Sequence, residues 1–531
     1  MNLRLLQINP IVGDVVGNLA LIKNGWTEAP SNTDLVISPE LAVCGYPPLD
    51  LLNEDSFIYS CMRAVEIFAK ENRHAPPLII GCPWILNNAR YNAAIFIEDG
   101  AIGHVFTKRA LPNYDVFDEK RYFVEGNQNN VLTLNGHRLL ITICEDLWVC
   151  SPKQFIGKAA NSETSLSAVI NLSASPYAKN QQAEREKAIA NFAKEAKSVI
   201  AYCNQTGANT ELIFDGKSGL YGENGPLSHT PGFVSCSLDI NTAALDCNDQ
   251  VKNSGEEEVL QALTIGVRDY FQKLGFTRAI LGLSGGLDSA LVAYIACRAI
   301  GAENVLGVLL PSEFSSDHSV DDALTLAQRL GMPTKTLPIQ ACFTQTRESL
   351  QESQGRLQPV TEENLQARLR GLLLMALAND EGRVLLNTSN KSEAAVGYTT
   401  IYGDMCGGLS VLGDVWKSEA YKLAQHINRE KEVIPYNILS KPPSAELRPN
   451  QSDVDELPDY SVLDPFLEEI VEWSRPIQLS TSTTLSKEEK ERVYELIERA
   501  EWKRFQTPPV LRISHKAFGS GRRIPIVKQR S

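Results

Sequence analysis

The sequence feature that most constrains the fold is a glycine-rich segment at residues 284–289, with the order Ser-Gly-Gly-Leu-Asp-Ser. The apolar residues 279–283 before it are typical of a buried strand, and residues 290–297 after it are typical of a helix. A glycine-rich turn from a strand into a helix presents backbone N–H groups and the positive end of the helix dipole to an anion. Because Asp288 would repel a bound phosphate unless a cation lay between them, the segment also indicates Mg²⁺.

A second apolar strand pattern at residues 305–310 makes this region a βαβ unit, which predicts a parallel sheet. An ordinary turn of small residues would explain a Gly-Gly pair alone. The whole six-residue pattern resembles the pyrophosphate loop of the ATP pyrophosphatases, which cleave ATP to AMP and pyrophosphate. It is not a Walker A loop, because no G-x-x-x-x-G-K-[ST] occurs in the chain.

Composition argues against several classes of protein. The 51 basic and 64 acidic residues give a formal net charge of −13 over 531 residues, which argues against broad binding of nucleic acid or anionic membranes. We find no apolar run of about 18 residues, so we expect no membrane span. The eleven cysteines lack C-x-x-C pairs and the seven histidines lack H-x-x-x-H spacing. We therefore expect reduced thiols, a cytoplasmic location and no zinc site.

The chain reads as two halves with a polar seam near residue 250. The first half alternates short apolar runs with helical stretches such as 182–197, which predicts a layered α/β domain. We assign residues 1–245 to a first domain, 246–257 to a linker and 258–531 to a second domain with a C-terminal tail. Residues 435–458, rich in Pro, Asn, Ser and Asp, predict a mobile loop. The predicted strands of the first half are 35–38, 78–81, 94–97, 139–143, 168–171 and 199–202.

Three separated residues of the first half form a candidate catalytic set: Glu40, Lys108 and Cys144. Taken singly, each has an ordinary explanation as a loop carboxylate, a solvated cation or a buried small residue. Together they suit nucleophilic catalysis, because a thiol attacks an amide carbonyl as the thiolate and needs a base and a cation nearby.

The order of Glu40, Lys108 and Cys144 along the chain, together with residues 171–177, resembles the nitrilase superfamily. The resemblance covers most of residues 1–240. The resemblance implies an α-β-β-α sandwich with a Glu–Lys–Cys triad. Glu40 would be the base that later passes its proton to departing ammonia. Cys144 would be the nucleophile, and Lys108 would stabilise the oxyanion with help from a backbone N–H near that cysteine.

The resemblance also places the groups that bind the amide substrate. The second half of the chain resembles a synthetase that consumes ammonia, and such a synthetase commonly obtains its ammonia from glutamine. The amide substrate of the first half is therefore expected to be glutamine. Tyr114 and Ser175 match glutamine-binding positions. Six residues past this serine the family pattern has a basic residue, and this chain has Gln181.

Four downstream motifs narrow the reaction of the second half. They lie at residues 363–370, 387–393, 402–405 and 514–519, and as a set they resemble the NAD synthetase family. With the nitrilase-like half in front, the whole chain resembles the glutamine-dependent members of that family. The family performs the last step of NAD biosynthesis: ATP adenylates the nicotinate carboxylate of deamido-NAD(+), pyrophosphate leaves, and ammonia displaces AMP.

The resemblance implies a Rossmann-like parallel sheet of the ATP pyrophosphatase type, with ATP as co-substrate and Mg²⁺ held by Asp288 and Glu393. The residues implied to bind ATP are Gly282, Leu283, Ser284, Gly285, Gly286, Leu287, Asp288, Ser289, Thr388 and Lys417. Those implied to face deamido-NAD(+) are Asn364, Arg368, Glu393 and Lys516. Ile401 and Gly408 stand where single-domain relatives that use ammonia have polar residues.

One chain with an amide-cleaving site and an ammonia-consuming site predicts an internal tunnel, and the family resemblance implies a homo-oligomer. Two alternatives remain open. In the first, the chain is an amidotransferase for another acid, and the motifs around Asn364 and Lys516 argue against it. In the second, the chain is a non-catalytic protein that binds adenine dinucleotides. Intact Glu40, Cys144 and Asp288 argue against the second alternative.

Overall fold

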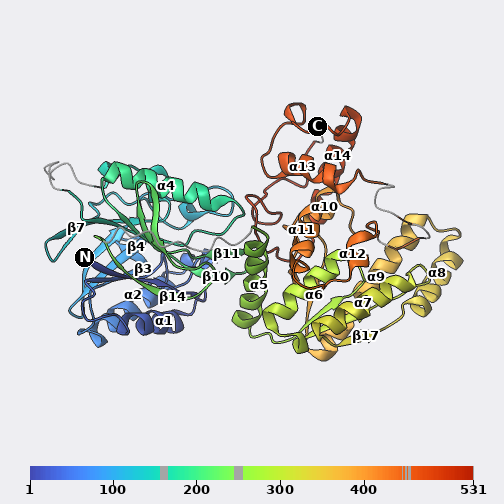
Figure 1. Ribbon diagram of the computed structural model, residues 1–531, viewed down its shortest axis with the longest axis horizontal. Coiled ribbons are helices and arrows are strands. Elements are labelled where there is room, and N and C mark those ends of the chain that lie inside the picture. The colour runs from blue at the N-terminus through green and yellow to red at the C-terminus, as the bar shows by residue number, and fades with distance from the viewer. Residues whose placement is uncertain (156–164, 244–254, 445, 449–450, 452–455, 530–531) are drawn as a thin grey trace. The chain divides into compact units, whose positions relative to one another are not determined.

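The computed structural model describes residues 1–155, 165–243, 255–444, 446–448, 451 and 456–529. The chain divides into two compact units, Met1–Lys252 and Asn253–Ser531 (Figure 1). Residues 246–254 of the predicted linker lie outside the described residues, and its last three residues belong to helix α5 (Gly255–Leu274). The linker boundaries therefore stay a prediction. Among the helices of the described residues, none is long and apolar enough to cross a membrane.

The first unit contains two six-stranded mixed sheets, a short hairpin and helices. The sheet orders are β14-β1-β2-β3-β4-β5 and β13-β12-β9-β8-β7-β6. The strands of the first sheet are β1 (Asn2–Gln7), β2 (Leu35–Ile37), β3 (Leu78–Leu86), β4 (Ala89–Glu98), β5 (Ala101–Thr107) and β14 (Cys236–Asn241). Those of the second are β6 (Val131–Leu134), β7 (His137–Ile143), β8 (Ala168–Ser173), β9 (Ile200–Asn204), β12 (Gly219–Gly222) and β13 (Gly225–His229), and the hairpin is β10 (Thr206–Asn209) with β11 (Leu212–Asp215). The helices are α1 (Val15–Thr27), α2 (Asp55–Glu71), α3 (Asp146–Val149) and α4 (Gln181–Ala196).

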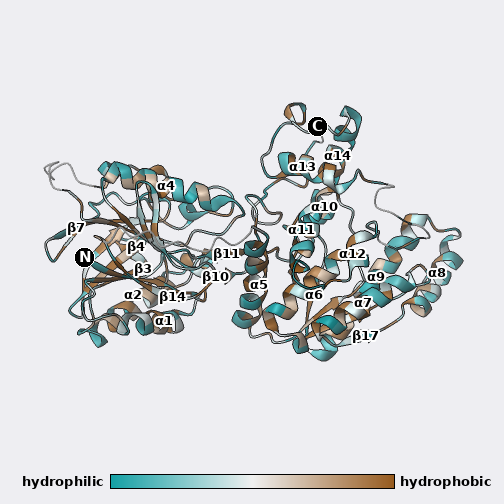
Figure 2. Ribbon diagram, in the orientation of Figure 1, coloured by the Kyte–Doolittle hydropathy of each residue, from teal (hydrophilic) through white to brown (hydrophobic). Residues whose placement is uncertain are grey.

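Alternation along the strands gives each sheet two buried faces. Ile37 of β2 and Ile141 of β7 belong to the apolar layer between the sheets. Val36 of β2 packs in the opposite direction against α1 and α2, and Leu140 of β7 packs against α4. Figure 2 shows the strands mainly in brown and α4 largely in teal. These layers confirm the expected α-β-β-α sandwich.

The second unit is built on a five-stranded parallel sheet in the order β17-β16-β15-β18-β19. The strands are β15 (Ala279–Gly282), β16 (Val305–Leu309), β17 (Thr334–Thr336), β18 (Val384–Asn387) and β19 (Leu409–Ser410). The helices after α5 are α6 (Leu287–Ile300), α7 (Asp317–Leu330), α8 (Gln340–Gln354), α9 (Pro359–Glu381), α10 (Lys391–Val396), α11 (Lys417–Ile427), α12 (Tyr436–Ser440), α13 (Tyr460–Val471), α14 (Lys487–Arg499) and α15 (Glu501–Arg504). The predicted βαβ unit and parallel sheet are confirmed as β15-α6-β16.

The predicted loop at residues 435–458 differs from the structure at its beginning. Residues Tyr436–Ser440 form helix α12, and Ile438 in this helix is only 1% exposed. Burial of one apolar side chain thus fixes a helical turn in a segment whose composition favours irregular structure. Residues 445, 449–450 and 452–455 of this segment lie outside the described residues.

The layer between the two sheets gives a stability prediction. Ile141 is fully buried there, so replacing it with alanine removes methyl and methylene groups and leaves a cavity. We expect Ile141→Ala to lower the free energy of unfolding of the first unit by about 2–5 kcal/mol in urea denaturation. Ile67→Ala on α2, where the side chain is 46% exposed, is the matched control and should change it by less than about 1 kcal/mol. Equal effects of the two variants would contradict the assigned core.

Candidate active sites

The three residues predicted as a catalytic set lie at the ends of strands from both sheets of the first unit. Glu40 follows β2, Lys108 follows β5 and Cys144 follows β7. The ammonium Nζ of Lys108 is 2.7 Å from Oε1 of Glu40. The side chains are buried, with residue exposures of 1% for Glu40 and Lys108 and 7% for Cys144.

A second glutamate, Glu119, completes this cluster and was missed from the sequence. Nζ of Lys108 donates to both of its carboxylate oxygens at 2.8 Å. The hydroxyl of Tyr46 donates to it at 3.0 Å, and the amide of Asn92 donates to Glu40 at 2.7 Å. Glu119 stands in a charged run that reads as an exposed loop, so only its burial and its partners identify it.

Burial sets the protonation of the cluster. It raises the pKa of Glu119, against the opposing effect of Lys108. It acts to lower the pKa of Lys108, but the carboxylates of Glu119 and Glu40 outweigh it and hold that pKa above its ordinary value. Burial, then the Glu40 charge, raises the pKa of the Cys144 thiol well above its usual range, and Lys108 opposes them. The thiol is therefore protonated at neutral pH and needs a base at the moment it attacks.

Cys144 is held in an uncommon backbone conformation. Its φ is +43°, a region that L residues rarely adopt outside constrained sites, and its amide donates to the carbonyl of Leu172 at 2.8 Å. The buried carboxylate of Asp146 accepts from the amide of Ile143 at 2.9 Å and from the amide of Ala110 at 2.8 Å. Asp146 thus ties the turn of the cysteine to the loop that carries Lys108.

Two of the residues implied to bind glutamine border this cluster. The Tyr114 hydroxyl donates to Glu145, the neighbour of Cys144, at 3.1 Å, and the tyrosine is 55% exposed. Ser175 follows Ala174, whose amide donates to Oε2 of Glu40 at 3.0 Å.

The side chain of Asn204 fixes the backbone of Ser175, since its Oδ1 accepts from the serine amide at 2.9 Å. Gln181 is the first residue of α4 and is partly buried. Four residues further along that helix, Nη1 of the buried Arg185 donates to both carboxylate oxygens of Asp215, at 2.9 and 3.1 Å. That arginine is therefore already paired and does not replace the basic residue expected at position 181.

The glycine-rich segment of the second unit forms the turn from β15 into α6, as predicted. Gly285 has a φ of +74°, and a Cβ atom there would lie 2.1 Å from the carbonyl oxygen of Ser319. Only glycine fits this turn. The hydroxyls of Ser284 and Ser289 lie 3.1 Å apart within it. The amide of Leu283 donates to the carbonyl of Val308 in β16, and the amides of Ser284 and Gly286 donate to the two hydroxyls.

Three of the residues implied to bind ATP, metal or dinucleotide converge on one another. Nζ of Lys417 is 2.5 Å from Oδ2 of Asp288 and 3.6 Å from Oε1 of Glu393. Burial acts to lower the pKa of Lys417, but these carboxylates outweigh it and raise that pKa. Oδ1 of Asp288 is buried without a hydrogen-bond partner among the described residues.

The chemistry of this carboxylate pair fits Mg²⁺. The cation prefers a few carboxylate oxygens, with phosphate and water as its other ligands. No group of three or more His, Cys, Asp or Glu side chains in the described parts of the chain could hold a metal ion by itself. A cation here would therefore need oxygens from water or phosphate to complete its shell.

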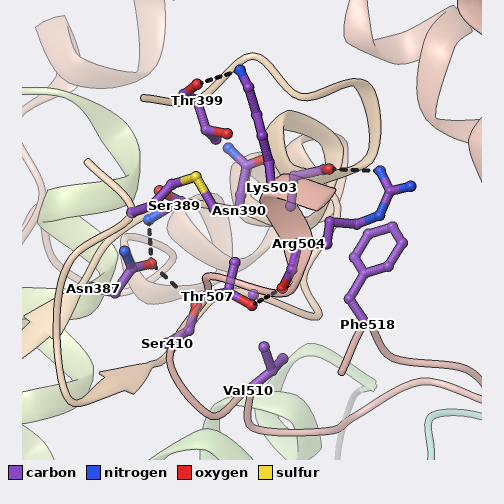
Figure 3. Close-up of a pocket in the computed structure, with 13 residues that line it drawn as sticks. Asn387, Ser389, Asn390, Thr399, Ser410, Lys503, Arg504, Thr507, Val510 and Phe518 are labelled. Atoms are coloured by element: carbon purple, nitrogen blue, oxygen red, sulfur yellow. Dashed lines mark hydrogen bonds between the residues drawn. The ribbon is translucent and has the colours of Figure 1, made fainter. Parts of the chain in front are cut away.

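The motif after β18 positions its members through successive side chains. Asn390 caps α10 by accepting from the amide of Glu393 at 3.0 Å. The hydroxyl of Ser392 accepts from the amide of Lys417 at 2.9 Å and donates to Asp464 at 2.6 Å. Thr388 lies in the same turn, between Asn387 and Ser389. Both of these neighbours line the small pocket shown in Figure 3, which is also lined by residues of α15.

The residues implied to face deamido-NAD(+) are only partly brought together. Asn364 and Arg368 are on α9, where Oδ1 of the asparagine accepts from Thr400 at 2.7 Å and the guanidinium donates to the carbonyl of Ile401 at 3.2 Å. Lys516 comes from the C-terminal segment and donates to Ser474 at 3.4 Å.

The two departures from the family pattern contribute backbone groups. The carbonyl of Ile401 accepts from Arg368, and that of Gly408 accepts from Tyr270 at 2.9 Å. The side chain of Ile401 is buried.

Comparison with known proteins matches both units. Residues 2–249 match the family model for carbon-nitrogen hydrolases, and residues 259–507 match the model for NAD synthase. A glutamine-dependent NAD(+) synthetase from Synechocystis sp. is 40% identical over 99% of this chain and 98% of its own length. One from Thermotoga maritima is 37% identical over 100% and 99%. The structure of glutamine-dependent NAD+ synthetase from Acinetobacter baumannii in complex with ADP has a TM-score of 0.79 and 35% identity, covering 99% of this chain and 98% of that chain.

The charge of Glu119 predicts the ionisation of the cysteine. Burial and the charge of Glu40 raise the pKa of Cys144 most, and the carboxylate of Glu119 adds to them, so we expect Glu119→Gln to lower that pKa. Alkylation of Cys144 by iodoacetamide, followed by mass spectrometry across a pH series, should then reach its half-maximal rate at a lower pH. The control is Glu125→Gln, an exposed glutamate paired with Lys120, which should leave the profile in place. A shift to higher pH in Glu119→Gln would refute the assignment.

The turn at Gly285 predicts a steric effect on nucleotide binding. We expect Gly285→Ala to weaken ATP binding about tenfold or more in calorimetry, because the added methyl group meets the Ser319 carbonyl and the φ is positive. Gly331→Ala is the matched control, since φ there is +72° and nothing lies within 4 Å of the added Cβ. It should lower stability by about 1 kcal/mol and leave ATP affinity unchanged. Equal ATP affinities for both variants would rule out the close approach.

Proposed function

This chain belongs to the glutamine-dependent NAD(+) synthetases, and from this we propose that it converts deamido-NAD(+), ATP and glutamine into NAD(+), AMP, pyrophosphate and glutamate. The observation that carries the proposal is the presence of two complete sets of groups in one chain. The first unit has a buried cysteine beside a Glu–Lys–Glu cluster. The second has a glycine-rich phosphate turn beside Asp288, Glu393 and Lys417.

In the proposed glutaminase step, Glu40 accepts the proton of the Cys144 thiol as the sulfur attacks the glutamine amide carbon. Lys108 donates to the developing oxyanion. When the C–N bond breaks, Glu40 returns the proton and ammonia leaves. Water, activated by the same carboxylate, then hydrolyses the thioester and releases glutamate and the free thiol. Glu119 holds Lys108 in place by accepting hydrogen bonds from the lysine ammonium.

We propose Tyr114, Ser175 and Gln181 as the glutamine-contacting groups. The position of Tyr114 beside Glu145, and the placement of Ser175 by Asn204, support the first two. Gln181 lies six residues after Ser175 in the sequence, at the start of α4.

In the proposed synthetase step, the nicotinate carboxylate displaces pyrophosphate from the α-phosphate of ATP, and ammonia then displaces AMP. The turn at 282–289, with Thr388 and Lys417, would bind ATP, and Asn364, Arg368, Glu393 and Lys516 would bind deamido-NAD(+). Mg²⁺ held by Asp288 and Glu393 would neutralise charge on the phosphates. Lys417 keeps those two carboxylates close together, which supports this placement.

We also propose that the protein works as a homo-oligomer in the cytoplasm and passes ammonia internally. The second unit exposes an apolar patch, in which Leu372 of α9 is 63% exposed and the neighbouring Tyr402 is 74% exposed. This patch supports self-association, since exposed apolar patches commonly mark protein–protein contacts. The ten cysteines of the described residues are all free thiols, which suits a reducing compartment.

The proposal is tested by incubating the purified protein with deamido-NAD(+), ATP, Mg²⁺ and glutamine. NAD(+), AMP, pyrophosphate and glutamate should form in near-equal amounts. Glutamate without NAD(+) would retain the glutaminase and reject this acceptor, and a panel of other carboxylic acids would then identify the true one. Binding of deamido-NAD(+) without any turnover would reject catalysis.

The division of labour between the units predicts the behaviour of a cysteine variant. Cys144→Ala should lower glutamine-driven NAD(+) formation by about 1,000-fold or more, because the nucleophile is lost. With added ammonium salt, NAD(+) formation should stay within about twofold of wild type, since the second unit is unchanged. Cys150→Ala, a partly buried cysteine in the same region, is the control and should retain both activities. Loss of both activities in Cys144→Ala would contradict separate sites.

A further inference from the structure

One fully buried lysine has no role in the chemistry proposed above. Lys391 is 0% exposed and is the first residue of α10. Its Nζ lies 2.7 Å from Oδ1 of Asp414 and 2.7 Å from Oε1 of Glu472. It also donates to the hydroxyl of Ser514 at 2.8 Å and to the backbone carbonyl of Lys516 at 3.0 Å. The last acceptor belongs to a residue proposed to bind deamido-NAD(+).

These contacts replace the hydration of the ammonium. Removing a charge from water is unfavourable by several kcal/mol unless its donors are all satisfied. The ammonium also lies 4.6 Å from the ring centroid of Trp416, whose indole N–H donates to Glu472 at 2.9 Å. Because its partners come from three separate segments, at residues 414–416, 472 and 514–516, Lys391 can be satisfied only when all three are in place.

Asp414 extends the hold over the C-terminal segment. Its Oδ2 accepts from the amides of Ile513 and Ser514 at 2.8 and 2.7 Å, and its Oδ1 accepts from the Ser514 hydroxyl at 2.8 Å. Arg512 donates to the carbonyls of Ser514 and His515 at 3.1 and 2.7 Å. Residues 513–516 are thus held at their backbone by buried charges rather than by a helix or sheet.

The same lysine lies close in sequence to the other proposed ligand-binding residues. Glu393 follows it by two positions on α10, and Lys417 follows Trp416 at the start of α11. The cluster therefore connects the segments that carry Glu393, Lys417 and Lys516.

We propose that Lys391 is a positioning residue for dinucleotide binding, which fixes the C-terminal segment so that Lys516 faces the site with Glu393 and Lys417. It touches no substrate. The proposal rests on the proposed function, because it assigns the effect to the affinity for deamido-NAD(+). Loss of the ammonium should loosen residues 513–516 and raise the KM for this substrate, while the chemical step keeps its groups.

The experiment compares Lys391→Met and Ser514→Ala with wild type in the full chain. We expect the KM for deamido-NAD(+) to rise about tenfold in Lys391→Met and less in Ser514→Ala, with kcat within about threefold. Hydrogen exchange at the amides of Ile513 and Ser514 should accelerate in both variants. The control is Lys335→Met, which removes a half-exposed lysine paired with Glu381 in the same unit. Glutamine hydrolysis to glutamate, measured in the same samples, should be unchanged in all variants.

The outcomes separate this inference from the proposed function. Absence of NAD(+) formation by wild type would reject the function itself. If wild type forms NAD(+) and the variants keep its KM, or lose kcat alone, the positioning role is wrong. If Lys391→Met fails to fold because Asp414 and Glu472 are left unpaired, Ser514→Ala decides, since it preserves the ion pairs and removes only the hydroxyl.

Discussion

The first unit depends on the need of a buried ammonium for negative partners. Lys108 is out of water, and it is stable there only because Glu40 and Glu119 lie at 2.7–2.8 Å. Three segments must therefore meet at one point: the end of β2, the end of β5 and the loop that carries Glu119. The turn that carries Cys144 lies at the same point. The second unit repeats the device around Lys417, so each site is organised by one lysine shared between two carboxylates.

Much of the fold was predictable because buried strands leave an apolar pattern. The main exceptions arise from neighbours distant in sequence. The predicted strand 78–81 is much shorter than β3, since Pro83 normally ends a strand. In the structure Pro83 pairs only with β4, because β2 contacts β3 at Leu78 and Ile79 alone, so its missing N–H leaves no acceptor unsatisfied.

The candidate sites were predictable where a reactive residue follows a strand. Glu40 and Cys144 follow apolar runs, and their residue types indicate chemistry. Glu119 carries no such signal, because its charged neighbours resemble a solvated loop and its burial results from Lys108 and Tyr46. Lys391 was equally hidden, since its acid partners are 23 and 81 positions away in the chain, as the positions of Asp414 and Glu472 show.

The turn between β18 and α10 has a consequence for how this sequence can change. Asn390, Lys391, Ser392 and Glu393 are consecutive. Asn390 caps α10 itself, and the other three contact Glu472, Asp464 and Lys417, which are distant in the chain. An insertion or deletion of one residue here would shift all four side chains at once, and no single compensating substitution could restore them. The length of this connection is therefore fixed more strictly than the identity of any one of its residues.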